Sequence, residues 1–223
     1  MSAIPELHGF LWIEKIKKHA KDLKKSLPAL RYLERLEISA RQFAGKRDYK
    51  ECRSLHEKHL LSYRYVKDQT AEQQLHQWQC AFCGLAFDPS SKADKKHIEQ
   101  HKLFEIAYYK TGYNPDCYAV REDKIRDVRE KYKNLSSSDS QATRLEICIG
   151  IYKRFYDRSF EKAILCGYWE QHPPFHRFVA MTEIKNPLRP DDFKMFHEKF
   201  GILKGHIPPG HSYWTPQGSN FLY

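Results

Sequence analysis

The chain has 223 residues, of which 41% are hydrophobic and 14% aromatic, enough to build a core in one large or two small domains rather than a disordered chain. Its 38 Lys and Arg outnumber 28 Asp and Glu, and the resulting net charge of +10 favours polyanionic partners. Ten Gly and 11 Pro are too few for an all-β protein full of tight turns, and no apolar run reaches the ~18 residues of a membrane span.

The N-terminal sequence places its short apolar run before its charges, the reverse of a secretory signal. Of the six cysteines, only Cys80 and Cys83 lie close together, unlike the disulfide frameworks of small secreted proteins. We therefore expect an intracellular protein in a reducing compartment, with no membrane partner.

Positive charge is concentrated in residues 1–76, where 16 Lys and Arg stand against 10 Asp and Glu. The spacing of Ile13, Ile16, Ala20, Leu23 and Leu27 predicts an amphipathic helix. Its other faces carry candidate nucleic-acid contacts, namely Lys15, Lys17, Lys18, Lys21, Lys24 and Lys25. A solvated helix face that binds nothing is the alternative interpretation.

Two more helices are expected before residue 76. Leu30, Leu33, Leu36 or Glu37, Ala40 and Phe43 form one apolar stripe, which Gly45 ends. Tyr49, Cys52, His56, Leu60 and Tyr63 form the next, with Asp48 as a possible cap. Residues 1–76 are thus predicted to fold as a helical hairpin or a three-helix bundle.

A metal-ligand pattern follows, Cys80-x2-Cys83-x13-His97-x3-His101. Two cysteines in a tight turn can bind one ion, and histidines four residues apart lie on one helix face. Two thiolates and two imidazoles are a tetrahedral ligand set that Zn²⁺ prefers in structural sites. The spacing therefore predicts one structural Zn²⁺ bound by these four side chains.

This stretch resembles the Cys2His2 zinc-finger family over residues 77–104. The resemblance extends to Trp78, before the first cysteine, and to Phe87, where the family has its core phenylalanine. It departs from the family where a core leucine is expected, near Ala93 and Asp94, and no second finger follows. The resemblance implies a ββα unit whose Lys92, Lys95 and Lys96 can contact phosphates.

Residues 111–223 are predicted to be mainly helical. Apolar positions recur at helical spacing over 120–135 and 145–165, and a short β-leaning run covers 178–181. Asp191 or Asp192 is expected to cap a last helix that Gly201 ends. We expect the Pro- and aromatic-rich tail to pack on the body; ordering on a partner is the alternative.

Other patterns have a functional and an ordinary interpretation. A second metal site could be formed by Cys148, Cys166, His172 and His176, and another by Cys52, His56 and His59. The alternative is that the cysteines are buried and the histidines lie on the surface. Residues 152–160 interleave cations with aromatics, as in base-stacking surfaces or in a helix with an aromatic core face. No Gly-rich phosphate loop and no G-x-S-x-G elbow occurs, so we expect no enzyme and no small-molecule substrate.

The sequence therefore predicts a mainly α protein built around one ββα-like finger. The predicted regions are 1–76, basic and helical; 77–110, the finger with an extended helix; and 111–223, helical with an aromatic tail. We expect a nuclear, non-catalytic regulatory or processing factor that binds DNA or RNA and also has protein partners. The alternative is a zinc-stabilised adaptor or scaffold subunit of a nuclear complex.

Overall fold

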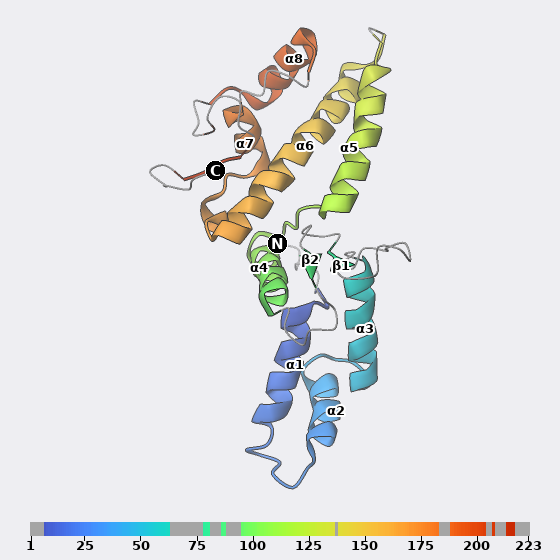
Figure 1. Cartoon of the computed structure of the whole chain (residues 1–223), viewed down its shortest axis with the longest axis vertical. Helices are drawn as coiled ribbons and strands as arrows, with labels where there is room; N and C mark the ends of the chain where they lie inside the picture. The colour runs from blue at the N-terminus through green and yellow to red at the C-terminus, as the bar shows by residue number, and fades with distance from the viewer. Residues whose placement is uncertain are drawn as a thin grey trace. The chain divides into compact units, whose positions relative to one another are not determined.

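The computed structural model describes residues 7–62, 78–80, 86–87, 95–136, 138–182, 188–203, 207 and 213–216. Over these residues the chain is mainly helical, as predicted, with eight α-helices and one two-stranded sheet (Figure 1). It forms two compact units, Met1–Cys117 and Tyr118–Tyr223. The expected regions 1–76 and 77–110 thus lie in one unit, and the second unit begins seven residues after the expected boundary.

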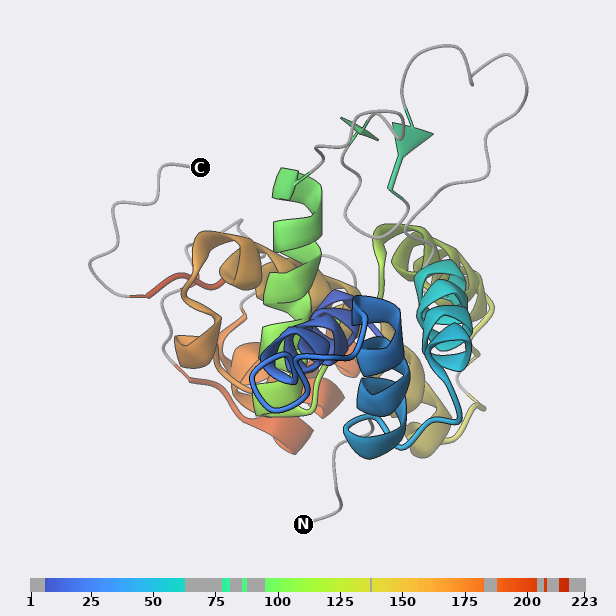
Figure 2. The ribbon, with the colours of Figure 1, turned by 90° about the horizontal axis from the view of Figure 1, so that it is seen from below.

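The first unit begins with three packed helices, α1 (Phe10–Asp22), α2 (Tyr32–Gln42) and α3 (Tyr49–Ser62) (Figure 2). Their shared core contains Trp12, Ile13, Ile16, Ala40 and Cys52. Gly45 follows α2 with a φ of 61°, and the Asp48 carboxylate accepts the Glu51 amide at 2.7 Å. The three-helix bundle and both helix-end signals are therefore confirmed. Tyr63, the last position of the third predicted stripe, lies outside the described residues.

Two predicted core positions of α2 are wrong. Leu33 is 72% exposed and Phe43 is 48% exposed. The Ser39 hydroxyl donates to the Ile16 carbonyl at 2.8 Å, and Arg35 Nε donates to the Ala20 carbonyl at 3.1 Å. These bonds pack the middle of α2 against α1. Leu33 and Phe43, near the two ends of the apolar stripe, lie beyond the part of α2 that α1 covers.

The same unit contains β1 (Trp78–Gln79), β2 (Ala86–Phe87) and α4 (Lys95–Thr111). The strands pair antiparallel, with Trp78 opposite Phe87. Helix α4 packs against α1 and ends at Thr111, directly before Gly112, which has a φ of 71°. This packing places the predicted ligand helix directly beside the lysine-rich helix.

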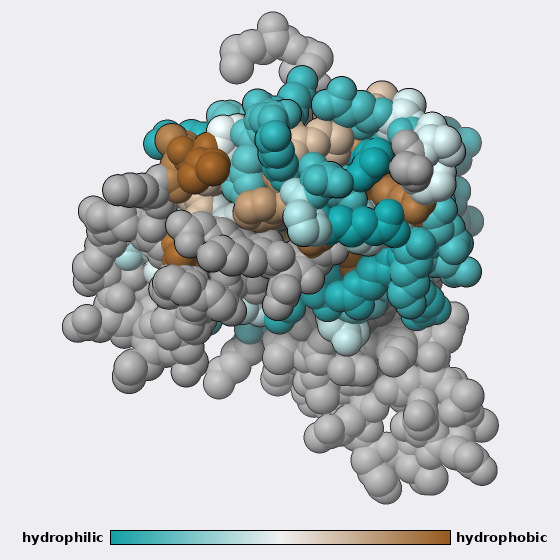
Figure 3. Space-filling view, turned by 90° about the horizontal axis from the view of Figure 1, so that it is seen from above, coloured by the Kyte–Doolittle hydropathy of each residue, from teal (hydrophilic) through white to brown (hydrophobic). Residues whose placement is uncertain are grey.

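The second unit is organised around the long helix α6 (Gln141–Cys166), which pairs with α5 (Tyr118–Lys133). The Ser140 hydroxyl caps α6 by accepting the Thr143 amide. Shorter elements pack on α6: the 3₁₀ turn η2 (Trp169–Gln171), α7 (Phe175–Met181) and α8 (Pro190–Phe200). The described surface in Figure 3 is mostly hydrophilic, with small separate hydrophobic patches.

Two local predictions in this unit are wrong. Residues 178–181 belong to helix α7, where burial of Phe178 and Val179 outweighs their strand preference. Arg189 is the N-cap of α8, whereas Asp192 is fully buried and accepts hydrogen bonds from Tyr132 Oη at 2.9 Å and Arg144 Nε at 2.7 Å. The predicted end of α8 at Gly201 is confirmed.

The described part of the tail packs on the body, as expected. Trp214 is 8% exposed, and its amide donates to the Ser159 hydroxyl at 2.9 Å. Arg158 lies 5.2 Å from the centroid of the Tyr213 ring. Phe221, Leu222 and Tyr223 lie outside the described residues.

Candidate metal centre and basic face

Helix α4 brings the two predicted histidine ligands together. His97 and His101 are four residues apart, so both rings project from one face of the helix, and both are buried. Cys80 follows β1 and is fully buried. Three of the four predicted ligands are thus gathered in the interior of the first unit, and Cys83 lies outside the described residues.

The ligand atoms converge on one point. His101 Nε2 lies 2.8 Å from His97 Nε2 and 3.4 Å from Cys80 Sγ, and one ligand atom from each residue falls within 4.8 Å of the others. A tetrahedral zinc ion would separate two imidazole nitrogens by about 3.3 Å and a nitrogen from a sulfur by about 3.6 Å. The donor set fits such an ion after an outward movement of about 0.5 Å between the rings.

Aromatic and histidine side chains surround this cluster. The His101 ring lies 6.1 Å from the Phe10 ring and 6.4 Å from the Phe104 ring, measured between centroids. Burial, and to a smaller extent the positive charges of His56, His8 and His101, together lower the pKa of nearby His59 to about 4. His59 is therefore neutral at pH 7.

The other proposed ligand groups are not assembled. Among the described residues, Cys80, His97 and His101 form the one group with metal-binding geometry. Cys148 is buried in the apolar core, and Cys166 and His176 are exposed. His172 is hydrogen-bonded to the Ser159 hydroxyl at 2.8 Å.

The Cys52, His56 and His59 pattern is likewise no ligand set. His56 Nδ1 donates to the His8 carbonyl at 2.8 Å, and burial raises the pKa of Cys52 to about 11. The described cysteines, Cys52, Cys80, Cys117, Cys148 and Cys166, are all free thiols.

Six exposed lysines, which we call the lysine face, lie on α1 or directly after it: Lys15, Lys17, Lys18, Lys21, Lys24 and Lys25. The predicted continuation of this helix to Leu27 is wrong, because α1 ends at Asp22 and Lys24 and Lys25 lie in the turn that follows. Among the described residues, none of the six lysines forms an ion pair, although Lys15 Nζ lies 5.4 Å from the centroid of the Tyr109 ring. The nearby Glu14 carboxylate is bound by Lys102 at 2.6 Å. The lysine face is therefore available to an anionic partner.

The lysines predicted on the finger are only partly described. Lys95 begins α4 and is exposed. Lys96 lies in α4, but its side chain is outside the described residues, as is all of Lys92.

A buried carboxylate joins the two parts of the site. Glu105, one turn after His101 on α4, accepts the amides of Phe10 and Leu11 at 2.7 Å each. It is 2% exposed, and burial raises its pKa above the usual value while the two amide bonds lower it. Gly9, the N-cap residue of α1, has no side chain that could cap the helix. Glu105, 95 residues after Phe10 in the sequence, caps α1 instead. Sequence spacing gave no signal for this contact.

The stretch of cations and aromatics at residues 152–160 has a structural role. In residues 152–160, the aromatic residues Tyr152, Tyr156 and Phe160 are buried, so the core interpretation of this stretch is the correct one.

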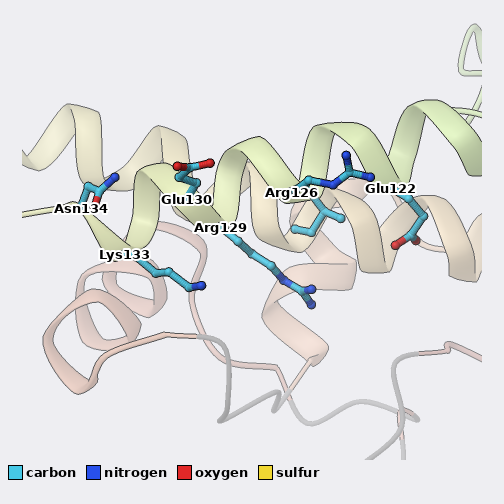
Figure 4. Close-up of a pocket in the computed structure, with 7 residues that line it drawn as sticks. Glu122, Arg126, Arg129, Glu130, Lys133 and Asn134 are labelled. Atoms are coloured by element: carbon cyan, nitrogen blue, oxygen red, sulfur yellow. The ribbon is translucent and has the colours of Figure 1, made fainter.

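The structure also has a cavity of about 560 Å³ along α5 (Figure 4), lined by Glu122, Ile125, Arg126, Arg129, Glu130, Lys133 and Asn134. Its three cations and two carboxylates do not select one charge of ligand.

In the described part of the chain, no helix has the length and apolarity that crossing a membrane requires. Comparisons of the chain with protein-family models, with curated proteins and with solved structures found no match.

Proposed function

We propose that Cys80, His97 and His101, with Cys83 as fourth ligand, bind one structural Zn²⁺ in a nuclear, nucleic-acid-associated regulatory or processing factor. The observation that carries this proposal is the convergence of the three described ligand atoms in a buried site. The short strand pair followed by α4 supports the resemblance to a Cys2His2 finger. Four protein ligands close the zinc shell, so the metal has a structural and not a catalytic role.

The nucleic-acid part of the proposal rests on the lysine face and on its attachment to α4. Six exposed lysines favour phosphates through counterion release. Because Glu105 caps α1 and His101 lies one turn earlier on the same helix, an ordered metal site also holds the start of the lysine-rich helix in place.

The zinc proposal is tested by metal analysis of the purified protein and of Cys80→Ala, Cys83→Ala and His101→Ala. We expect one zinc per wild-type chain, and loss of zinc with a lower melting temperature in each variant, because metal binding contributes folding free energy. Cys166→Ala and His176→Ala, at exposed positions of the same residue types, are matched controls that keep the metal. A zinc-free wild-type protein with a cooperative unfolding transition would contradict the assignment.

The nucleic-acid proposal is tested by titrating the protein with single- and double-stranded DNA and RNA at two salt concentrations. We expect affinity to fall steeply with salt, and each lysine removed from the lysine face to reduce the slope of log K against log salt by about 0.7–0.9 if it neutralises one phosphate. The control replaces Lys194 and Lys199, which are exposed on α8 in the other unit. Absence of binding at low salt would reject this function.

An adaptor is the second candidate, favoured by the apolar side chains that α4 exposes. Leu103 and Ile106 lie three residues apart on one face of α4, and each is 37% exposed. Partner capture that survives charge reversal of Lys17, Lys18 and Lys21 but fails in Leu103→Ser would favour the adaptor over nucleic-acid binding.

A further inference from the structure

We propose that Phe43 is a base-stacking residue, and that Phe43, His19 and the lysine face together bind a single-stranded nucleic acid. This inference rests on the proposed nucleic-acid function and adds two points to it. It specifies unpaired bases as the ligand, and it identifies an aromatic residue outside the finger that contacts them.

Phe43 is a partly exposed ring on a fixed support. Its ring stacks on that of His19, with centroids 5.3 Å apart and an interplanar angle of 22°. Because the buried Ser39 hydroxyl donates to the Ile16 carbonyl, His19 Nδ1 is the donor in its 3.0 Å bond to Ser39 Oγ. The support is thus held in one orientation, while 48% of Phe43 stays exposed to a ligand.

The backbone around Phe43 is also fixed. Phe43 is the C-cap of α2, and its amide donates to the Ser39 carbonyl. Two residues later, Gly45 adopts a φ of 61°, and the Lys46 amide donates to the Ala40 carbonyl at 2.9 Å. This hydrogen-bonded helix end presents the ring in a defined position, so little conformational entropy is lost when a base stacks on it.

The charge around Phe43 favours an anionic ligand over an apolar protein segment. Lys15 lies one turn before His19 on α1, and Arg41, Lys46 and Arg47 flank Phe43 in the sequence. Asp22 lies on the same side of α1, and Asp48 pairs with Arg47 at 3.2 Å. Glu51 also lies here and accepts the Arg47 amide at 2.9 Å. Among the described residues, Lys15, Arg41 and Lys46 form no ion pair, so these three cations can contact phosphates beside a stacked base.

An unpaired base is required because the bases of a duplex are already stacked on their neighbours. Single-strand-binding surfaces combine cations for the backbone with exposed aromatic rings for successive bases. Phe43 supplies the ring and the lysine face supplies the cations, so we expect a preference for single strands that the charge alone would not give.

The test measures affinities of the full chain, wild type and Phe43→Ala, for a single-stranded oligonucleotide and for a duplex of matched length at one salt concentration. RNA and DNA arms are run in parallel. Stacking on one aromatic ring corresponds to about a 5- to 150-fold change in affinity. We expect a loss of this size for the single strand only, with duplex affinity unchanged within about 2-fold.

Three variants make the result specific. Phe43→Trp keeps a ring and should retain single-strand affinity. Phe43→Leu keeps apolar volume without a ring and should lose single-strand affinity. If Phe43→Ala does not fold, Phe43→Leu provides the test in its place. Leu33→Ala, at another exposed apolar position of α2, should bind like wild type.

The outcomes separate the two proposals. If the wild-type protein binds nucleic acid, and Phe43→Ala and Phe43→Leu bind single strands with the wild-type affinity, this inference is overturned and the proposed function stands. An equal loss for single strands and duplexes would also overturn it. A wild-type protein that binds no nucleic acid at low salt would reject the proposed function itself.

Discussion

Replacing Glu105 by alanine should detach the start of α1 from α4. The Glu105 carboxylate accepts two amide hydrogen bonds of 2.7 Å, and bonds to charged groups contribute about 1.5–3 kcal/mol each, or about 3–6 kcal/mol together. Part of this is offset by burying the carboxylate, as the raised pKa of Glu105 indicates. Loss of a helix N-cap generally costs about 0.5–2 kcal/mol. We therefore expect Glu105→Ala to lower the free energy of unfolding by about 2–3 kcal/mol.

Two measurements check this expectation. Urea denaturation gives the change in unfolding free energy, and hydrogen exchange reports directly on the amides of Phe10 and Leu11, which should lose protection first. Glu99→Ala is the matched control, because Glu99 lies on the same helix but is 66% exposed, and its ion pair with Lys102 contributes at most about 1 kcal/mol. Unchanged protection of both amides and a loss below about 0.5 kcal/mol in Glu105→Ala would refute the capping role.

Three further predictions concern other buried groups. A Cβ at Gly9 would lie 2.1 Å from Glu105 Oε1, so Gly9→Ala should cost about 1–3 kcal/mol in urea denaturation, and clearly less in the Glu105→Ala background. Arg144→Ala leaves the buried Asp192 carboxylate without its cation and should cost about 3 kcal/mol, whereas replacing the exposed pair residue Arg126 by alanine should cost less than about 1 kcal/mol. Burial lowers the pKa of His172 from 6.5 to about 4, so the unfolded chain binds this proton first. The stability from His172 should be complete above pH 6.5 and fall by about 3 kcal/mol toward pH 4; an NMR titration of the folded protein with a midpoint near 6.5 would contradict this.

The sequence alone was sufficient for features that depend on neighbouring residues. Apolar positions repeating every three or four residues predicted α1, α2 and α3, and Gly45, Asp48 and Gly201 marked helix ends correctly. The i, i+4 spacing of His97 and His101 was enough to place both rings on one face of α4. These predictions succeed because helical periodicity and capping are set within a few residues of the chain.

Only the tertiary structure decided which apolar and polar groups have a partner. Leu33 and Phe43 belong to the apolar stripe of α2 but are exposed, because α1 covers only part of that stripe. Glu105 resembles a surface carboxylate in the sequence, yet it caps a helix 95 residues away. The convergence of Cys80 with the two histidines likewise depends on how separate segments pack. Periodicity identifies the face of a helix that is apolar, whereas long-range packing determines what covers that face and which buried polar groups meet.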